Sequence, residues 1–155
     1  MLDTLVYLKN ETDVWLEITN LLIPGENDSE EEVESMCRWI RKNLGPEVPV
    51  HFSAFHPDFK MLNKSKTPLE TILKACEIAR ASGIHYVYAG NVHNQENDTT
   101  YCHECDESLI GRDWYVLKDW NIDSGRCPKC QTVCAGRFEK SPGTWGSRRQ
   151  MVQIT

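Results

Sequence analysis

Residues 67–90 read TPLETILKACEIARASGIHYVYAG and contain one complete helix-to-strand unit. Thr67 is a helix-capping residue type, Pro68 suits the first helical position, and Glu70 completes a capping box. Apolar side chains then recur with helical spacing as far as a glycine, the residue type that most often ends helices. Residues 84–89, IHYVYA, are rich in β-branched and aromatic side chains and predict a strand. The stretch therefore indicates an α/β fold.

The residues before this stretch repeat the alternation. Residues 14–23, VWLEITNLLI, and residues 48–55, VPVHFSAF, predict two earlier strands. Between them, Ser29 and Glu32 form a capping box at the start of an amphipathic helix. Residues 2–9 predict the tail of a preceding helix. Strands that alternate with amphipathic helices predict parallel pairing through right-handed crossovers.

Three parallel strands leave two outer edges with unpaired backbone groups, and one face of the sheet can lack cover. We therefore expect a piece of a larger sheet, with a small complete α/β domain as the alternative. In parallel sheets the chemistry lies at the carboxyl ends of the strands. In this sequence those ends are the loops PGEND (24–28), HPDFKM (56–61) and GNVHNQEND (90–98).

Composition narrows the class of protein. The chain has 155 residues, and residues 1–98 carry nine Lys/Arg against sixteen Asp/Glu, a net charge of −7. Residues 99–155 carry eight against seven, a net charge of +1. An acidic first part and a nearly neutral second part favour no nucleic-acid partner. No apolar run approaches the ~18 residues of a membrane span, so we expect no membrane partner either.

Cysteine usage indicates the compartment. The start of the chain, MLDTLVYLKNETD, has an acidic residue at position 3 and only a short apolar run, unlike a secretory signal. Seven cysteines without an export signal favour a reducing compartment, where close cysteine pairs bind metal more often than they form disulfides. The sequence therefore predicts a cytoplasmic protein.

Four cysteines have the spacing of a metal site. Cys102 and Cys105 are separated by two residues, as are Cys127 and Cys130, with twenty-one residues between the pairs. A two-residue gap lets both sulfurs of a pair bind one ion, and the intervening residues can form a hairpin that joins the pairs. Because four thiolates complete a tetrahedron and leave no position for a substrate, we expect structural Zn²⁺.

Three alternatives to this zinc site stay open. A redox-active Cys-x-x-Cys pair needs a helix directly after it, and neither pair is followed by a helical pattern. An iron–sulfur cluster can use the same cysteines. Cys134 lies four residues after the last of them and can replace a ligand, although packing is the favoured role. The tail, residues 136–155, predicts a final strand or an extended arm.

The motifs resemble a known family. LEITNLLIPGEND (16–28), PVHFSAFHPDFKM (49–61), TPLETILKACEIARASGIHYVYAGNV (67–92) and the paired-cysteine tail resemble the C-terminal half of AmmeMemoRadiSam-system radical SAM enzymes, relatives of the pyruvate formate-lyase-activating enzymes. The resemblance implies a partial TIM-like barrel. Its first half would hold a 4Fe-4S cluster on a Cys-x3-Cys-x2-Cys loop, next to S-adenosylmethionine.

The sequence departs from that family in two respects. It has no Cys-x3-Cys-x2-Cys loop, and Cys127-x2-Cys130-x3-Cys134 has the spacings reversed. It also lacks a Gly-Gly-Glu type segment, which binds the methionine amino group in such enzymes. The resemblance matches His56 to a histidine near bound S-adenosylmethionine, and it places Asn91 at the same mouth. The alternative for His56 is a turn residue that hydrogen-bonds within HPD.

Together these inferences predict a partial parallel (β/α) barrel segment of about three strands, residues 1–98, followed by a zinc-ribbon-like β appendage, residues 99–155. The expected function is that of the C-terminal portion of a radical SAM enzyme. We expect the chain to be inactive without the missing N-terminal barrel half, which is either part of a longer polypeptide or a separate chain. A protein substrate is a further expected partner.

Two other functions compete with this one. The first is a non-catalytic zinc-ribbon module that binds a protein partner through Trp114, Tyr115 and Trp120, with the α/β part as a scaffold. The second is a free-standing domain that binds S-adenosylmethionine without radical chemistry.

Overall fold

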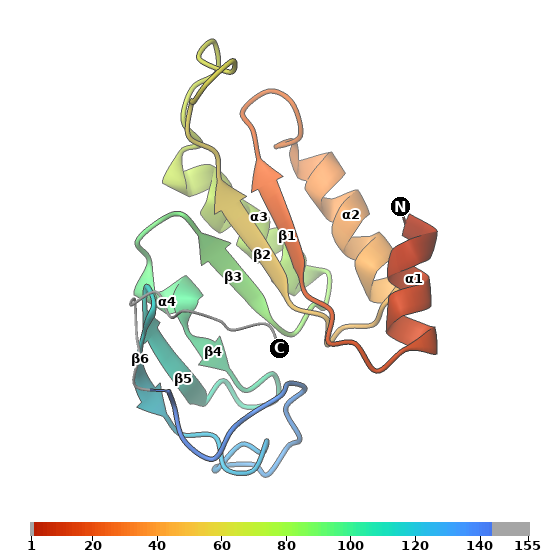
Figure 1. Cartoon of the computed structure of the whole chain (residues 1–155), viewed down its shortest axis with the longest axis vertical. Coiled ribbons are helices and arrows are strands. Elements are labelled where there is room, and N and C mark those ends of the chain that lie inside the picture. Colours follow the sequence, from red (N-terminus) through yellow and green to blue (C-terminus); the bar gives the residue numbers. More distant parts are fainter. Residues whose placement is uncertain (1, 144–155) are drawn as a thin grey trace, which may run out of the picture. The chain divides into compact units, whose positions relative to one another are not determined.

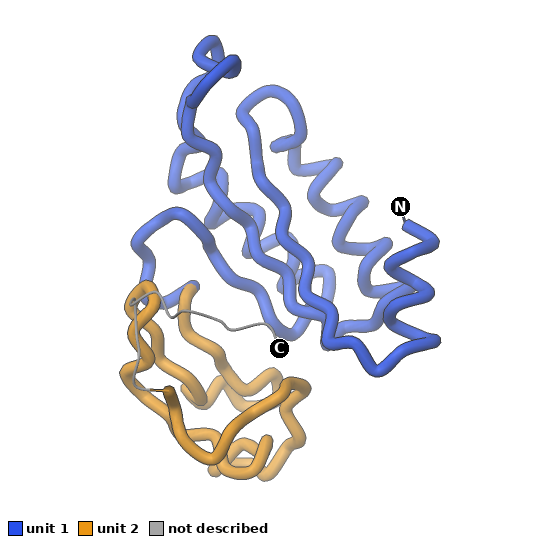
Figure 2. Tube along the Cα trace, viewed as in Figure 1, with its two compact units in different colours: residues 1–97 blue, residues 98–155 orange. Residues whose placement is uncertain are grey.

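The computed structural model describes residues 2–143, which form two compact units (Figure 2). Unit 1 comprises Met1–Asn97, and unit 2 comprises Asp98–Thr155. The strand or arm expected at 136–155 lies mostly outside the described residues, and residues 136–143 form no strand. Within the described part, none of the helices combines the length and the apolar character needed to cross a membrane.

Unit 1 contains a parallel sheet with strand order β1-β2-β3, and unit 2 contains an antiparallel sheet with strand order β4-β5-β6 (Figure 1). The mixed α/β class and the three parallel strands are thus confirmed. The described residues contain no closed barrel. The elements in chain order are α1 (Leu2–Glu11), β1 (Ile18–Leu22), α2 (Glu30–Asn43), β2 (Val50–Ala54), α3 (Leu69–Ala81), β3 (Val87–Gly90), α4 (Gln95–Asp98), β4 (Thr100–Tyr101), β5 (Ser108–Asp113) and β6 (Val116–Trp120).

The start of α2 is the one that the sequence predicts. Ser29 is the N-cap, and its Oγ accepts a hydrogen bond from the backbone N–H of Glu32 at 3.3 Å. Ser29 Oγ also lies 2.7 Å from Glu32 Oε2, so the two side chains hold each other. Three acidic residues in the first turn favour this end of the helix electrostatically.

The start of α3 differs from the prediction. Its N-cap is Pro68, and no side chain caps the helix. Thr67 instead lies buried, and its Oγ1 donates to the Leu22 carbonyl at 2.6 Å and accepts from the Phe55 N–H at 2.9 Å. The Thr67 N–H also donates to the Phe55 carbonyl at 3.1 Å. The hydroxyl satisfies backbone groups at the ends of β1 and β2 that have no access to water, whereas the free N–H groups of a helix start can bind water.

One face of the parallel sheet is covered. Side chains alternate between the two faces of a strand, and the buried set on β1–β3 packs with α2 and α3 in a single core. Both crossover helices therefore lie on the same side of the sheet. The core is made up of Leu22, Val33, Cys37, Ile40, Leu44, Val48, Val50, Phe52, Ala54, Ile72, Ala75, Cys76, Ala79, Ile84, Val87 and Ala89.

The opposite face, which we call the open face, is largely polar. Its residues are half-buried or exposed, and only one of them is aliphatic. They are Thr19, Leu21, His51, Ser53, Tyr88 and Gly90. A parallel sheet whose second face packs against another apolar layer carries Val, Ile and Leu there. The open face is therefore not built to receive a layer of apolar helices.

Unit 2 has a much smaller core. Its buried cluster consists of Cys102, Leu109, Ile110, Ile122, Cys127 and Cys134. Half of these residues are cysteines, so hydrophobic burial alone provides little stability. Domains with so few buried apolar side chains usually need a metal or disulfides.

The Thr67 contacts generate a test of the fold. Thr67→Val keeps the shape of the side chain but leaves the Leu22 carbonyl and the Phe55 N–H without their hydroxyl partner, so we expect a loss of about 2–3 kcal/mol in the free energy of unfolding. Thr67→Ser should lose far less, because it keeps the hydroxyl. Thr71→Val on α3 is the matched control. Urea unfolding followed by circular dichroism measures all three, and equal stability of Thr67→Val and Thr71→Val would contradict the assignment.

Candidate metal centre and strand-end pocket

The sulfur atoms of Cys102, Cys105, Cys127 and Cys130 all lie within 4.8 Å of one another. The Cys102 and Cys130 sulfurs are 3.5 Å apart, and those of Cys105 and Cys127 are 3.6 Å apart. Four sulfurs around one ion at about 2.3 Å would be separated by about 3.8 Å. The donor set therefore fits a single tetrahedral metal ion.

The first cysteine pair lies on a tight turn. The Cys102 N–H donates to the Glu107 carbonyl at 2.9 Å, and the Asp106 N–H donates back to the Cys102 carbonyl at 3.0 Å. Asp106 has a φ of 55°, the left-handed conformation that reverses the chain after the second cysteine. The turn thus directs both sulfurs to the same side before β5 begins.

The second pair repeats this backbone pattern. The Cys127 N–H donates to the Thr132 carbonyl at 3.0 Å, and the Gln131 N–H donates to the Cys127 carbonyl, also at 3.0 Å. Gln131, four residues after Cys127, has a φ of 62° and occupies the place that Asp106 has in the first turn. Two turns of the same design, on separate segments, thus present the four sulfurs that lie close together.

The pKa values of three of these thiols are shifted in different directions. Hydrogen bonds from the Thr132 hydroxyl and backbone N–H are the main cause that lowers the pKa of Cys130 to about 6. The backbone N–H of Glu107 lowers the pKa of Cys105, but burial and the neighbouring sulfurs outweigh it and raise that pKa to about 12. Burial raises the pKa of Cys102. Because a metal binds thiolates, it must displace the remaining protons, and its apparent affinity rises with pH.

Cys134 does not belong to the group of four close sulfurs. It is buried in the core of unit 2, and its Sγ lies 3.7 Å from the Thr132 carbonyl oxygen. The group of sulfurs that can share an ion does not include it. Cys37 and Cys76 are buried in the core of unit 1, where burial raises the pKa of each to about 11. These three thiols are packing residues.

An open pocket of about 410 Å³ lies where the parallel strands of unit 1 end. His56, after β2, and Asn91, after β3, both line it. His56 Nδ1 is 3.0 Å from the Pro57 carbonyl, the turn contact that the sequence offers as the alternative to a ligand role. Asn91 has a φ of 58° and donates from Nδ2 to the Ala54 carbonyl at 3.3 Å. The structure brings the two residues of the predicted cofactor site together.

Sequence reasoning missed Lys66, which lines the same pocket. Its signal was available: it precedes α3 at the carboxyl-end edge of the sheet, in a part of the chain where acidic residues predominate. No ion pair involves Lys66 among the residues that the structure describes.

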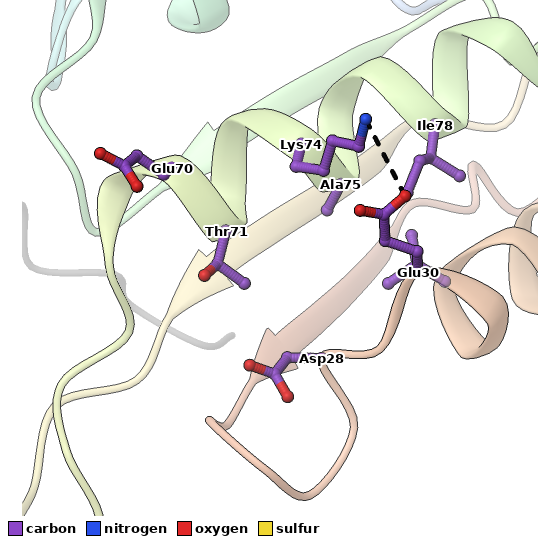
Figure 3. Close-up of a pocket in the computed structure, with 8 residues that line it drawn as sticks. Asp28, Glu30, Glu70, Thr71, Lys74, Ala75 and Ile78 are labelled. Carbon is purple, nitrogen blue, oxygen red and sulfur yellow. Dashed lines mark ion pairs between the residues drawn. The ribbon is translucent and has the colours of Figure 1, made fainter.

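A second, smaller pocket of about 260 Å³ lies between the starts of α2 and α3 (Figure 3). Asp28, Glu30 and Glu70 surround it, and Lys74 Nζ lies 3.9 Å from Glu30 Oε2. Asp28 accepts the Gly25 N–H, so it serves the turn before α2. The side chains of Glu30 and Lys74 are at least half exposed, which is ordinary for surface ion pairs. This pocket is not assigned a ligand.

The three aromatic residues proposed for protein docking do not share one environment. Trp114 and Tyr115 are 53% and 70% exposed at the turn between β5 and β6. Trp120 packs against the core of unit 2, and its Nε1 is buried without a hydrogen-bond partner in the described chain. Only the first two residues are available to a partner.

Comparison with known proteins gives one informative relative. Uncharacterized protein MJ0808 of Methanocaldococcus jannaschii is 39% identical over 125 residues, which cover 79% of this chain. The match covers 38% of the relative, so this chain spans well under half of the relative's length. No family model matches the chain, and no solved structure does.

The cysteine geometry predicts one metal ion per chain. Cys102→Ser should abolish stoichiometric binding and destabilise unit 2, because Cys102 is fully buried beside the other sulfurs. Cys134→Ser is the matched control and should retain one ion. Elemental analysis of the purified proteins, with thiol titration before and after chelation, measures both. Loss of the ion in Cys134→Ser, or its retention in Cys102→Ser, would contradict the assignment.

Proposed function

We propose that this chain forms the C-terminal part of a radical SAM enzyme of the activating-enzyme type, ending in a zinc-stabilised β appendage. The observation that carries the proposal is the one-sided parallel sheet of unit 1, with a ligand-sized pocket at the carboxyl ends of its strands. The sequence resemblance to AmmeMemoRadiSam-system enzymes adds the class of chemistry.

The strand order supports a barrel wall over a doubly wound sheet. A doubly wound sheet reverses its strand order and places helices on both faces. Here the strands follow chain order, and α2 and α3 pack on the same face. Successive βα units of this kind build the wall of a (β/α) barrel. Additional strands beside β1 and β3 would complete it.

The length of the relative supports the proposal that additional polypeptide completes the barrel. A related segment in Methanocaldococcus jannaschii is part of a protein more than twice as long as the match. The proposal places the Cys-x3-Cys-x2-Cys loop and its 4Fe-4S cluster in such an additional part, on the same polypeptide or a separate chain. This chain would then contribute barrel strands and the rim of the pocket.

In this proposal His56 and Asn91 contact S-adenosylmethionine at the rim. Both line the same pocket, at the edge of the sheet where parallel α/β proteins bind ligands. With Nδ1 next to the Pro57 carbonyl, the neutral His56 ring donates there and keeps Nε2 as an acceptor. The whole enzyme would generate a radical that abstracts hydrogen from a substrate or activates a partner protein.

For the metal of unit 2 we propose Zn²⁺. Four sulfurs close enough for one tetrahedral ion favour a single zinc over a cluster of several irons, around which the sulfurs would have to spread. Neither Cys-x-x-Cys pair is followed by a helix among the described residues, which disfavours a thioredoxin-like redox role. A filled tetrahedron makes the site structural.

A protein-binding module remains the second candidate because of one observation. Trp114 and Tyr115 form an exposed aromatic pair, with ring centroids 6.4 Å apart, on a turn of the metal-stabilised unit. Tyr and Trp are enriched where proteins dock. Trp120 is excluded from such a surface by its packing.

The radical SAM proposal is tested by reductive cleavage of S-adenosylmethionine. After anaerobic reconstitution with iron and sulfide, this chain alone should form no 5′-deoxyadenosine, because it lacks the cluster loop. The full-length Methanocaldococcus jannaschii relative, treated identically, should form it. Cleavage by this chain alone would contradict its role as a part, and no cleavage by the reconstituted full-length relative would contradict the radical SAM assignment.

A further inference from the structure

A row of side chains crosses the open face of unit 1 at the level of His51. In the sheet register, His51 on β2 lies between Thr19 on β1 and Tyr88 on β3. The His51 ring stacks on the Tyr88 ring, with centroids 4.9 Å apart and an interplanar angle of 26°. His51 Nε2 lies 2.9 Å from Glu17 Oε2. The imidazole is therefore fixed in both position and orientation.

Glu17 is itself held in place. The Trp15 Nε1–H donates to Glu17 Oε1 at 2.7 Å, so both carboxylate oxygens have partners. A carboxylate only accepts hydrogen bonds, so a neutral His51 must carry its proton on Nε2 and keep a lone pair on Nδ1. No hydrogen bond to Nδ1 occurs among the described residues, and the side chain is 31% exposed. The row thus presents an oriented acceptor to a ligand.

The next row of open-face residues, two positions further along each strand, lies between His51 and the strand-end pocket. Ser53 lies in register between Leu21 and Gly90, and Leu21 lines the pocket. A Cβ atom at position 90 would come within 2.5 Å of Ser53 Oγ, so glycine leaves room for the hydroxyl there. At about 3.3 Å per residue, His51 and the pocket residue Phe55 are separated by roughly 13 Å along the strand. A small molecule can span much of that length.

The far end of this path carries one exposed cation. Lys66 lines the pocket and forms no ion pair with the described residues, although the first 98 residues have a net charge of −7. An anionic group would find an available cation there, whereas His51 at the other end offers an acceptor for a hydroxyl hydrogen. The two ends therefore suit different groups of one ligand.

We propose that the open face of β1–β3 binds a small hydroxylated organic anion, whose anionic group contacts Lys66 and whose hydroxyl group donates to His51 Nδ1. Glu17 is a positioning residue that holds the His51 tautomer. Ser53 supplies a second hydroxyl contact between them. The site shares its strand-end pocket with the S-adenosylmethionine contacts proposed above, but it requires no iron. Binding of an organic anion to this chain is therefore measured separately from cleavage of S-adenosylmethionine.

The experiment compares two probes on the full chain by titration calorimetry: sn-glycerol 3-phosphate and inorganic phosphate. Glycerol 3-phosphate should bind about tenfold more tightly, because it can add a hydrogen bond to His51. His51→Leu should bring its affinity down to that of phosphate, and Lys66→Gln should weaken both probes. No binding of glycerol 3-phosphate, equal affinities for the two probes, or an unchanged preference in His51→Leu overturns the proposal.

The positioning role has its own readout. Nitrogen NMR of the His51 ring should show the Nε2–H tautomer in the wild type and a mixture of tautomers in Glu17→Leu, with a weaker preference for glycerol 3-phosphate. Glu34→Leu is the matched control, since Glu34 is similarly exposed and forms a 2.9 Å ion pair with Arg38 on α2. An Nδ1–H tautomer in the wild type, or equal effects of the two substitutions, overturns this role.

Discussion

Within the part of the chain that the structure describes, helices cover the parallel sheet of unit 1 on one face only, and the other features of that unit follow from this constraint. Because α2 and α3 both pack on the same side, the buried apolar strand residues face them, and Leu21 is the aliphatic residue on the other face. The second face is free to carry polar groups such as His51 and Ser53, which a sheet buried on both sides could not accommodate without partners. At the carboxyl ends of the strands, Thr67 hydrogen-bonds to Leu22 of β1 and to Phe55 after β2, and it thereby connects both strand ends to the start of α3. The pocket lined by His56 and Asn91 lies at that same end.

Unit 2 differs from unit 1 because its hydrophobic core is small. Its antiparallel strands bury few apolar side chains, and Cys102 and Cys127 occupy central positions in that small core. The four sulfurs lie close together, and the pKa values of Cys105 and Cys130 are shifted in opposite directions. Several thiolates at this distance would repel one another without a cation, whereas a bound cation would stabilise them. A metal ion bound by these four sulfurs would therefore be part of the fold of this unit.

Local signals in the sequence predicted the elements better than the roles of single side chains. The Ser29 cap was predictable because its partner, Glu32, lies within the same helical turn. Thr67 has an equally good capping pattern, but Leu22 and Phe55 come from other elements, and no local pattern reveals that competition. The grouping of the four cysteines was predictable from their spacing alone. The row around His51 was not, because Glu17, just before β1, and Tyr88, on β3, come from segments far apart in the sequence. The alternation in VHFSA gave only a partial signal, since it separates His51 from the core residues on either side.

We propose that the parallel sheet extends past the outer edge of β1. In the longer relative, the additional strands would come from the part of the polypeptide that has no counterpart in this chain. A high-resolution structure of the full-length Methanocaldococcus jannaschii protein tests it most directly. The account predicts that the strand equivalent to β1 pairs in parallel, on its outer edge, with a strand from the unmatched part, and that the open face lines the interior of the resulting barrel. An outer edge of that strand left unpaired, with the unmatched part folded as a separate domain, would contradict the account.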